Sequence, residues 1–130
     1  MEKPRSKHRP WSQPPSQQTE RLSKRLRDPF YHTAQWTRAS RIFLTENPLC
    51  IHCQQEGFIV ASRVTDHIVP KPICRDPWDS DNWQPLCTKH NNLKAIFDKT
   101  LIALFNKTGN YELVQQTASR YRAMELPPPA

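Results

Sequence analysis

The sequence predicts a small α+β domain that is stabilised by a bound zinc ion. Three observations lead to this fold class: a segment rich in β-branched residues, apolar residues at helical spacing on either side of it, and two cysteine-containing pairs with ligand spacing. The chain has 130 residues, a hydrophobic fraction of 36% and a mean hydropathy of −0.80. A domain with so little apolar material often depends on a metal or on disulfides for its stability.

The zinc prediction rests on the pairs Cys50-x-x-Cys53 and Cys87-x-x-His90. Two intervening residues allow a tight turn to direct both ligands at one ion, and three thiolates with one imidazole suit tetrahedral zinc. The protein then fills all four positions, so this ion is expected to be structural rather than catalytic. The alternative is chance spacing of buried free cysteines, but two pairs in a core-poor chain favour zinc.

Two other residues near these pairs are candidate ligands. His52 lies inside the first pair and is a rival ligand, although its side chain is expected to point away from the ion. Cys74 has no partner at ligand spacing and is interpreted as a loop thiol, with a substitute ligand as the alternative. The chain shows no apolar signal-peptide core and no membrane-spanning stretch, which predicts a cytoplasmic protein without membrane contact. A reducing compartment favours metal binding over disulfides.

The positive charge of the chain is concentrated at its beginning. Residues 1–27 contain eight Lys or Arg against two Glu, so they carry +6 of the total net charge of +7. This composition predicts a disordered basic arm that binds a polyanion, most simply nucleic acid. The candidate DNA contacts at the end of the arm are Arg21, Lys24, Arg25 and Arg27. The alternative is a solvated tail that only aids solubility.

A helix is predicted after Thr33, which can cap its first turn. Trp36, Ala39 and Phe43 fall on one face of this helix. The helix should end just before Pro48, because the residue before a proline disfavours the helical region. Its aromatic face is expected to pack on the zinc-stabilised core.

The rest of the chain is predicted from composition and spacing. The stretch "FIVASRVTDHIVP" predicts a strand, a short break and a second strand, followed by a loop rich in Pro and Asp. The stretch "LCTKHNNLKAIFDK" predicts a turn that continues into a helix. Residues 100–124 are compatible with a hairpin or with two helices.

Between the two ligand pairs lies an acid–histidine pair, Asp66 and His67, at the end of a predicted strand. Neighbouring residues on a strand point to opposite faces, so these two side chains are not expected to serve the same ion. The division that follows is Asp66 on a metal and His67 on a water, because histidine can take a proton near neutral pH. The alternative is a surface aspartate and a structural histidine.

The motifs "YHTAQW", "NPLCIHC", "VTDHIVP", "DNWQPLC" and "HNNLK" occur in an order that resembles the HNH endonucleases, in particular the small zinc-containing enzymes of phages and bacteria. The resemblance covers residues 31–94. It implies a ββα-metal core, to which the residues add the structural zinc knuckle, the N-terminal helix and the disordered basic arm. The expected organisation is an arm over 1–27, a nuclease domain over 28–99 and a C-terminal extension over 100–130.

The resemblance also implies roles for individual residues. His67 corresponds to the general base, and Asn82 to the residue that holds the hairpin loop and orients this histidine. Asp66 and Asn91 correspond to the ligands of the catalytic divalent ion, with Asn91 at the position that is usually histidine. An amide oxygen is a hard ligand, so Mg²⁺ or Mn²⁺ is expected there. Asn92 is the alternative ligand, but the Cys-x-x-His spacing favours Asn91.

The function implied is metal-dependent hydrolysis of DNA phosphodiester bonds, by nicking or double-strand cleavage, with 3′-hydroxyl and 5′-phosphate products. Lys94 and Lys89 are candidate DNA contacts, and a solvated helix lysine is the alternative for Lys94. Small phage members of the family often assist the DNA-packaging terminase, so packaging proteins are expected partners, in the host cytoplasm. The alternative function is a catalytically silent, zinc-stabilised DNA-binding or adaptor module.

Overall fold

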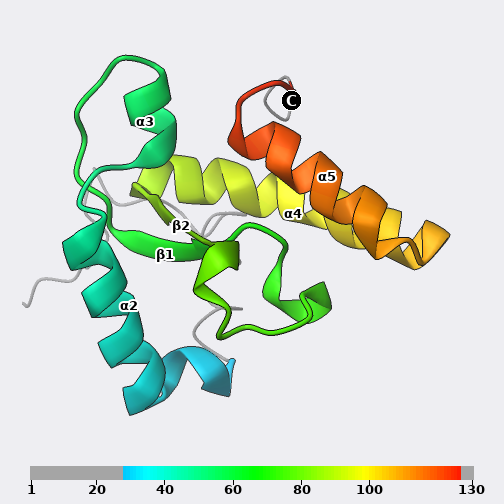
Figure 1. Cartoon of the computed structure of the whole chain (residues 1–130), viewed down its shortest axis with the longest axis horizontal. Helices are drawn as coiled ribbons and strands as arrows, with labels where there is room; N and C mark the ends of the chain where they lie inside the picture. The colour runs from blue at the N-terminus through cyan, green and yellow to red at the C-terminus, as the bar shows by residue number, and fades with distance from the viewer. Residues whose placement is uncertain (1–27, 127–130) are drawn as a thin grey trace, which may run out of the picture.

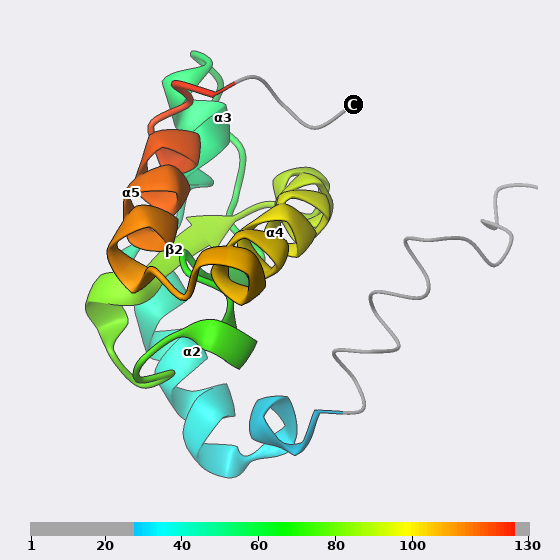
Figure 2. The ribbon, with the colours of Figure 1, turned by 90° about the vertical axis from the view of Figure 1, so that its right-hand side faces the viewer.

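A computed structural model describes residues 28–126 of the chain (Figure 1). The predicted basic arm over 1–27, with its candidate DNA contacts Arg21, Lys24, Arg25 and Arg27, lies outside the described residues, as do residues 127–130. Figure 1 shows a short hairpin, β1 and β2, with α2 beside it and α4 across it. The helix α5 returns along α4 in both ribbon views (Figure 2). No helix of the described part is long and apolar enough to cross a bilayer.

The predicted N-terminal helix is confirmed as α2, Ala34–Glu46, which follows a single turn of 3-10 helix, η1, Pro29–His32. The Thr33 hydroxyl accepts a hydrogen bond from the Trp36 amide at 3.1 Å, as expected of a capping residue. The helix packs on the hairpin and not on the zinc-stabilised core, so that expectation is wrong. The reason is aromatic packing, since Trp36 and Phe43 both contact the ring of Trp83 in β2.

The hairpin pairs β1, Val64–His67, with β2, Trp83–Leu86, in antiparallel register, with Val64 opposite Leu86 and His67 opposite Trp83. The strand expected at the start of "FIVAS" is absent, because this segment makes only one isolated bridge, between Leu49 and Ala61. β-Branched residues stabilise a strand mainly through neighbours on a sheet, and this segment has no second partner strand. The Pro-rich loop instead ends in β2, with short turns of 3-10 helix, η2 (Lys71–Ile73) and η3 (Ser80–Asn82), before it.

The C-terminal third forms two helices, so the hairpin alternative for residues 100–124 is excluded. The predicted helix after the second ligand pair extends much further than expected, as α4, Thr88–Thr108. Gly109 ends it with φ of 64°, a conformation that glycine adopts without strain. Asn110 then caps α5, Tyr111–Arg122, by accepting a hydrogen bond from the Leu113 amide at 3.0 Å.

The buried side chains form two separate clusters. The larger one joins α4 and α5 to the segment after β1, through Ile68, Val69, Phe97, Leu101, Val114, Ala118 and Tyr121. The smaller one consists of three cysteines with Leu86 and lies between β2, the start of α4 and the short helix α3, Ile51–Gln55. The candidate site lies between these clusters, where the end of β1 meets α4.

Candidate active site and zinc cluster

The four predicted zinc ligands converge in the structure and all are buried. Cys50 and Cys53 come from the start of α3, while Cys87 and His90 come from the first turn of α4. All four ligand atoms lie within 4.8 Å of one another. The Sγ atoms of Cys53 and Cys87 are 3.7 Å apart, and the Nδ1 atom of His90 is 3.3 Å from the Cys87 Sγ.

These separations fit a tetrahedral zinc ion. Bonds of about 2.3 Å from zinc to sulfur give sulfur–sulfur edges of about 3.8 Å in a tetrahedron. The measured separation of 3.7 Å agrees, and the Cys50 Sγ is 3.6 Å from the His90 Nδ1. Four protein ligands leave no open position, so the cluster suits a structural ion and not a catalytic one.

The surroundings of the cluster support this assignment. The carboxylate of Glu56 lies 3.6 Å from the Nε2 atom of His90, on the side of the ring away from the cysteines. Carboxylates commonly orient metal-bound histidines in this way. His52 is not part of the ligand group, and its buried ring packs against His90 and Tyr121. Burial and the neighbouring His90 lower the pKa of His52 to about 4, so its ring is neutral.

Cys74 is also outside the ligand group, as the loop-thiol interpretation predicts. Its Sγ lies 3.3 Å from the backbone oxygen of Lys71, within the turn that follows β1. Burial and the nearby Asp76 raise the pKa of this thiol, so it is a poor candidate for a reactive thiolate.

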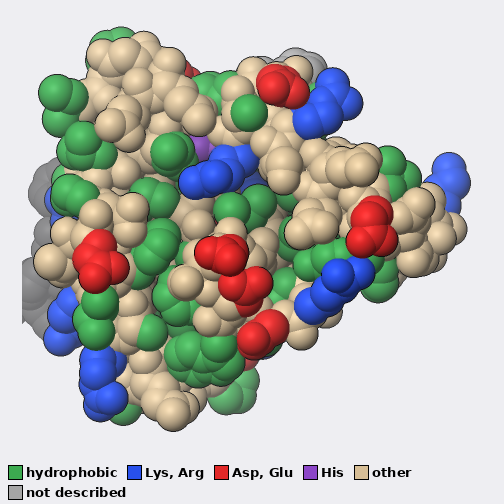
Figure 3. Space-filling view, in the orientation of Figure 1, with side chains coloured by type: hydrophobic (Ala, Val, Ile, Leu, Met, Phe, Trp, Pro, Cys, Tyr) green, Lys and Arg blue, Asp and Glu red, His purple; other side chains and the backbone are tan. Residues whose placement is uncertain are grey.

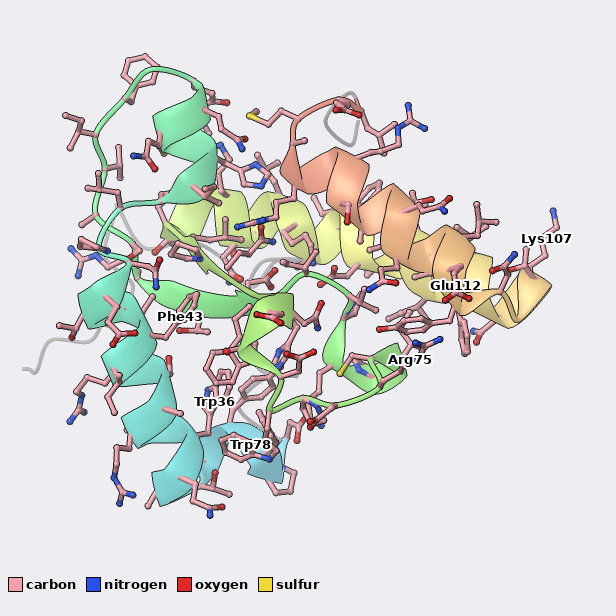
Figure 4. All side chains as sticks on the ribbon, viewed as in Figure 1. Trp36, Phe43, Arg75, Trp78, Lys107 and Glu112 are labelled. Carbon is pink, nitrogen blue, oxygen red and sulfur yellow. The ribbon has the colours of Figure 1, made fainter. Side chains whose placement is uncertain are left out.

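Asp66 and His67 point to opposite faces of β1, as their adjacency on a strand requires. Asp66 is turned toward α4, where its Oδ2 atom accepts a hydrogen bond from Gln84 Nε2 at 3.0 Å and lies 3.1 Å from Lys94 Nζ. His67 is turned toward α2, where its ring stacks on Trp36 with centroids 5.3 Å apart. Figure 4 shows Trp36 pointing from α2 into this region, with Trp78 beside it.

The His67 imidazole is 2% exposed and is enclosed mainly by aromatic rings. Phe30 and Tyr31 of η1 approach it with centroids 5.9 and 6.3 Å away. Its Nε2 atom lies 3.0 Å from the backbone oxygen of Pro77. A carbonyl can only accept, so Nε2 is the donor of this hydrogen bond.

Asn82 holds the start of the hairpin loop. Its Oδ1 atom accepts a hydrogen bond from the Val69 amide at 2.8 Å, and its Nδ2 atom donates to the Val69 oxygen at 3.0 Å. Its backbone oxygen also accepts from the Ile68 amide at 2.7 Å. These contacts match the loop-holding part of the expected role. The His67 ring hydrogen-bonds to Pro77 and contacts the surrounding aromatic residues.

Asn91 lies half-buried in the first turns of α4, and no described residue hydrogen-bonds to its side-chain amide. Residues three apart share a face of a helix, so Asn91 lies on the same face as Lys94, which contacts Asp66. The face that carries Asn91 is therefore turned toward the end of β1. Asn92 is also half-buried but is rotated by about 100° around the helix axis.

The prediction that Lys94 contacts DNA is wrong for this structure, and so is the solvated alternative. Lys94 is fully buried, and its ammonium group binds the carboxylates of Asp66 and Asp98 and the His67 backbone oxygen. Helical spacing alone does not reveal which face of α4 meets the hairpin, and Lys94 lies on that face. Lys89, the other candidate on this helix, is exposed.

Three contributors to the site were not singled out from the sequence. Gln84 is fully buried and binds Asp66, Pro77 supplies the carbonyl that meets His67, and Asp98 pairs with Lys94. The i,i+4 spacing of Lys94 and Asp98 was a visible signal for the third, since oppositely charged residues four apart on a helix often pair. Nothing in the sequence indicates the role of the Pro77 carbonyl.

Comparison with known proteins gives one informative match. No protein-family model and no curated protein sequence matches the chain. Among solved structures, the chain is similar to the manganese-bound crystal structure of the HNH endonuclease of the deep-sea thermophilic bacteriophage GVE2. The two share 33% sequence identity, with a TM-score of 0.51, over 64% of this chain and 90% of the phage enzyme.

Proposed function

The chain belongs to the HNH endonuclease family, and we propose that it is a divalent-metal-dependent endonuclease that hydrolyses phosphodiester bonds in DNA. The similarity to the phage enzyme supports a nuclease function. The observation that carries the finer proposal is the arrangement at the end of β1. There Asp66 faces α4, and the neighbouring His67 donates from Nε2 to the Pro77 oxygen at 3.0 Å, which leaves Nδ1 as the base.

In the proposed reaction, His67 Nδ1 removes a proton from the attacking water. The bond to the Pro77 oxygen fixes the ring and its tautomer, so the basic nitrogen is defined before substrate arrives. The imidazole is 2% exposed, so the rings of Phe30 and Tyr31 have to admit a water and the scissile phosphate. Asn82 supports the geometry indirectly, because it fixes the chain two residues after His67.

Asp66 and Asn91 are the proposed ligands of the catalytic ion. The Oδ2 atom of Asp66 is engaged by Gln84 and Lys94, while its Oδ1 atom receives no hydrogen bond from a described residue. A carboxylate and an amide oxygen are hard ligands that suit Mn²⁺ or Mg²⁺. A divalent ion held there would neutralise charge on the scissile phosphate and on the leaving 3′-oxygen.

DNA affinity is proposed to come mostly from basic residues outside the hairpin. On the face in Figure 3, basic side chains are scattered and do not form one continuous patch. The segment 1–27 carries +6 of the net charge of +7. Arg21, Lys24, Arg25 and Arg27, together with the exposed Lys89, are the proposed phosphate contacts. The family resemblance makes a phage packaging terminase the first protein partner to test.

The experiment that tests this function is cleavage of supercoiled plasmid by the zinc-loaded protein in Mg²⁺, Mn²⁺, Ni²⁺, Zn²⁺ or EDTA, beside His67→Ala. We expect conversion to open-circle or linear DNA in Mn²⁺ or Mg²⁺ and none in EDTA. Loss of the general base should reduce the rate by about 10²–10⁴-fold. The exposed His32→Ala is the matched control and should cleave like the parent. Equal cleavage by His67→Ala and the parent would remove His67 from the mechanism.

The second candidate function is a catalytically silent DNA-binding or adaptor module. The specific observation that favours it is the enclosure of His67 by aromatic rings, combined with the engagement of Asp66 by a lysine. The same plasmid assay distinguishes the two functions. A folded, zinc-loaded protein that shifts DNA in a gel, but cleaves it with none of these ions, would favour the silent module.

A further inference from the structure

The buried lysine of α4 has no role in the reaction proposed above. Lys94 is 0% exposed, and its Nζ atom has three partners: Asp66 Oδ2 at 3.1 Å, Asp98 Oδ1 at 2.5 Å and the His67 backbone oxygen at 2.8 Å. A buried ammonium group is costly unless it is paired and fully hydrogen-bonded. An ammonium group has three protons to donate, and each of them has a partner here.

These contacts fix the orientation of the Asp66 carboxylate. Two donors, Lys94 Nζ and Gln84 Nε2, converge on the same carboxylate oxygen, Oδ2. The other oxygen, Oδ1, receives no hydrogen bond from a described residue. Rotation of the carboxylate would break both contacts at once. Gln84 and Lys94 are fully buried, so neither could replace this partner with water. The carboxylate is therefore held with one oxygen engaged and one available.

The charges of Lys94, Asp66 and Asp98 also bear on how well Asp66 can bind a cation. The Lys94 ammonium group is paired with two carboxylates, Asp66 at 3.1 Å and Asp98 at 2.5 Å. A lone ammonium group at 3.1 Å from Asp66 would cancel the attraction of that carboxylate for a cation. Asp98 is a second acidic partner of the same ammonium group. The three side chains together then carry −1 when all are ionised.

We propose that Lys94 and Asp98 are positioning residues for the catalytic ion: Lys94, with Gln84, directs the Oδ1 atom of Asp66 toward the ion, and Asp98 offsets the lysine charge. This inference rests on the proposed function, which assigns Asp66 to the ion. Through its bond to the His67 oxygen, Lys94 also ties the backbone of the general base to the ligand beside it. Neither residue touches substrate or ion.

The test is Mn²⁺ binding to the zinc-loaded full chain without DNA, measured from the electron paramagnetic resonance signal of free Mn²⁺. The informative variant is Asp98→Asn, which keeps the shape of the side chain and removes its charge. We expect its dissociation constant for Mn²⁺ to rise by about 10-fold to 100-fold, the usual effect of losing an outer partner of a metal ligand. Asp98→Glu restores the charge and should recover most of the affinity.

The matched control is Glu112→Gln, the same acid-to-amide change on an exposed ion pair. Glu112 pairs with Arg75 at 3.6 Å, and Figure 4 shows both near the far end of α4, away from Trp36 and the hairpin. We expect this variant to bind Mn²⁺ like the parent. Thermal unfolding of every variant is measured in parallel, and unfolding of Asp98→Asn at assay temperature would overturn the inference, because the role would then be structural.

Asp66→Asn separates the inference from the function on which it rests. If Asp66→Asn loses Mn²⁺ binding while Asp98→Asn matches Glu112→Gln, the positioning role is wrong and Asp66 remains a ligand. If Asp66→Asn binds Mn²⁺ like the parent, the ligand assignment fails, and the positioning role fails with it. In support of the inference, Asp98→Asn should have no further effect in the Asp66→Asn background.

Discussion

The two ends of α4 are held in place by different forces. Its first turn carries two of the four zinc ligands, Cys87 and His90. The apolar part of this zinc cluster is small, and Leu86 is its fully buried aliphatic side chain. Its second half carries Phe97 and Leu101, which pack with α5 and with the segment after β1. The first end therefore depends on a metal and the second on the hydrophobic effect.

This difference explains how so small a core supports a precise site. Asp66 and His67 lie on β1, and the pairing of β1 with β2 connects them to the zinc cluster through Leu86. The segment just after His67 belongs to the apolar cluster, through Ile68 and Val69. The hairpin is thus anchored from both sides, and each anchor can be removed separately.

The largest effect is expected at the metal-held end. Cys50→Ser should abolish zinc binding and cooperative folding, because structural zinc sites supply on the order of 10 kcal/mol of folding free energy. Zinc content and circular dichroism melting measure this. Cys74→Ser is the control, since Cys74 is outside the ligand group, and it should keep both properties. A folded Cys50→Ser protein with a sharp melt would refute the structural-zinc assignment.

A smaller effect is expected at the apolar end. Leu101 is 0% exposed, and Leu101→Ala should lower the free energy of unfolding by about 2–5 kcal/mol, through lost burial and a cavity. The zinc content should stay at the parental value, which is the contrast with Cys50→Ser. Leu113→Ala, at a side chain that is 37% exposed, is the matched control in chemical denaturation. Similar losses at both leucines would mean that α5 is not anchored as described.

A still smaller effect is expected in the hairpin loop, which lies between the zinc-held and the apolar ends of α4. Asn82→Ala removes the two hydrogen bonds to the Val69 backbone, so we expect a loss of about 1–3 kcal/mol in unfolding free energy. Plasmid cleavage should fall as well, since the loop supports His67. The exposed Asn106→Ala on α4 serves as the control. Unchanged stability in Asn82→Ala would show that these two bonds contribute little.

The smallest effect is expected at the exposed surface of the first turn of α4. Lys89→Ala should weaken DNA binding slightly and reduce the slope of log affinity against log salt by about 1, as for one lost phosphate contact. Lys107→Ala, on the last turn of the same helix, is the control and should leave the slope unchanged. An identical slope for the parent and Lys89→Ala would remove Lys89 from the DNA interface.

Local spacing predicted several features correctly. The ligand pairs, the cap at Thr33 and the end of α2 before Pro48 each depend on residues a few positions apart, whose geometry is fixed by the backbone. The family resemblance added the correct ββα arrangement. The strand at the start of "FIVAS" was wrong because β-branched composition cannot tell whether a partner strand will be adjacent.

Two lysines of α4 show which features follow from local sequence patterns and which depend on how the chain packs. The spacing of its neighbours predicted that Lys94 lies on a helix that follows a turn containing Lys89. The pair spacing predicted the zinc ligands, because both features depend on short-range geometry. Only the packing of α4 across the hairpin decided that Lys94 is buried against Asp66 while Lys89 is exposed. The same packing enclosed His67 in aromatic rings from η1 and α2. Such contacts join residues distant in sequence, and no local pattern encodes them.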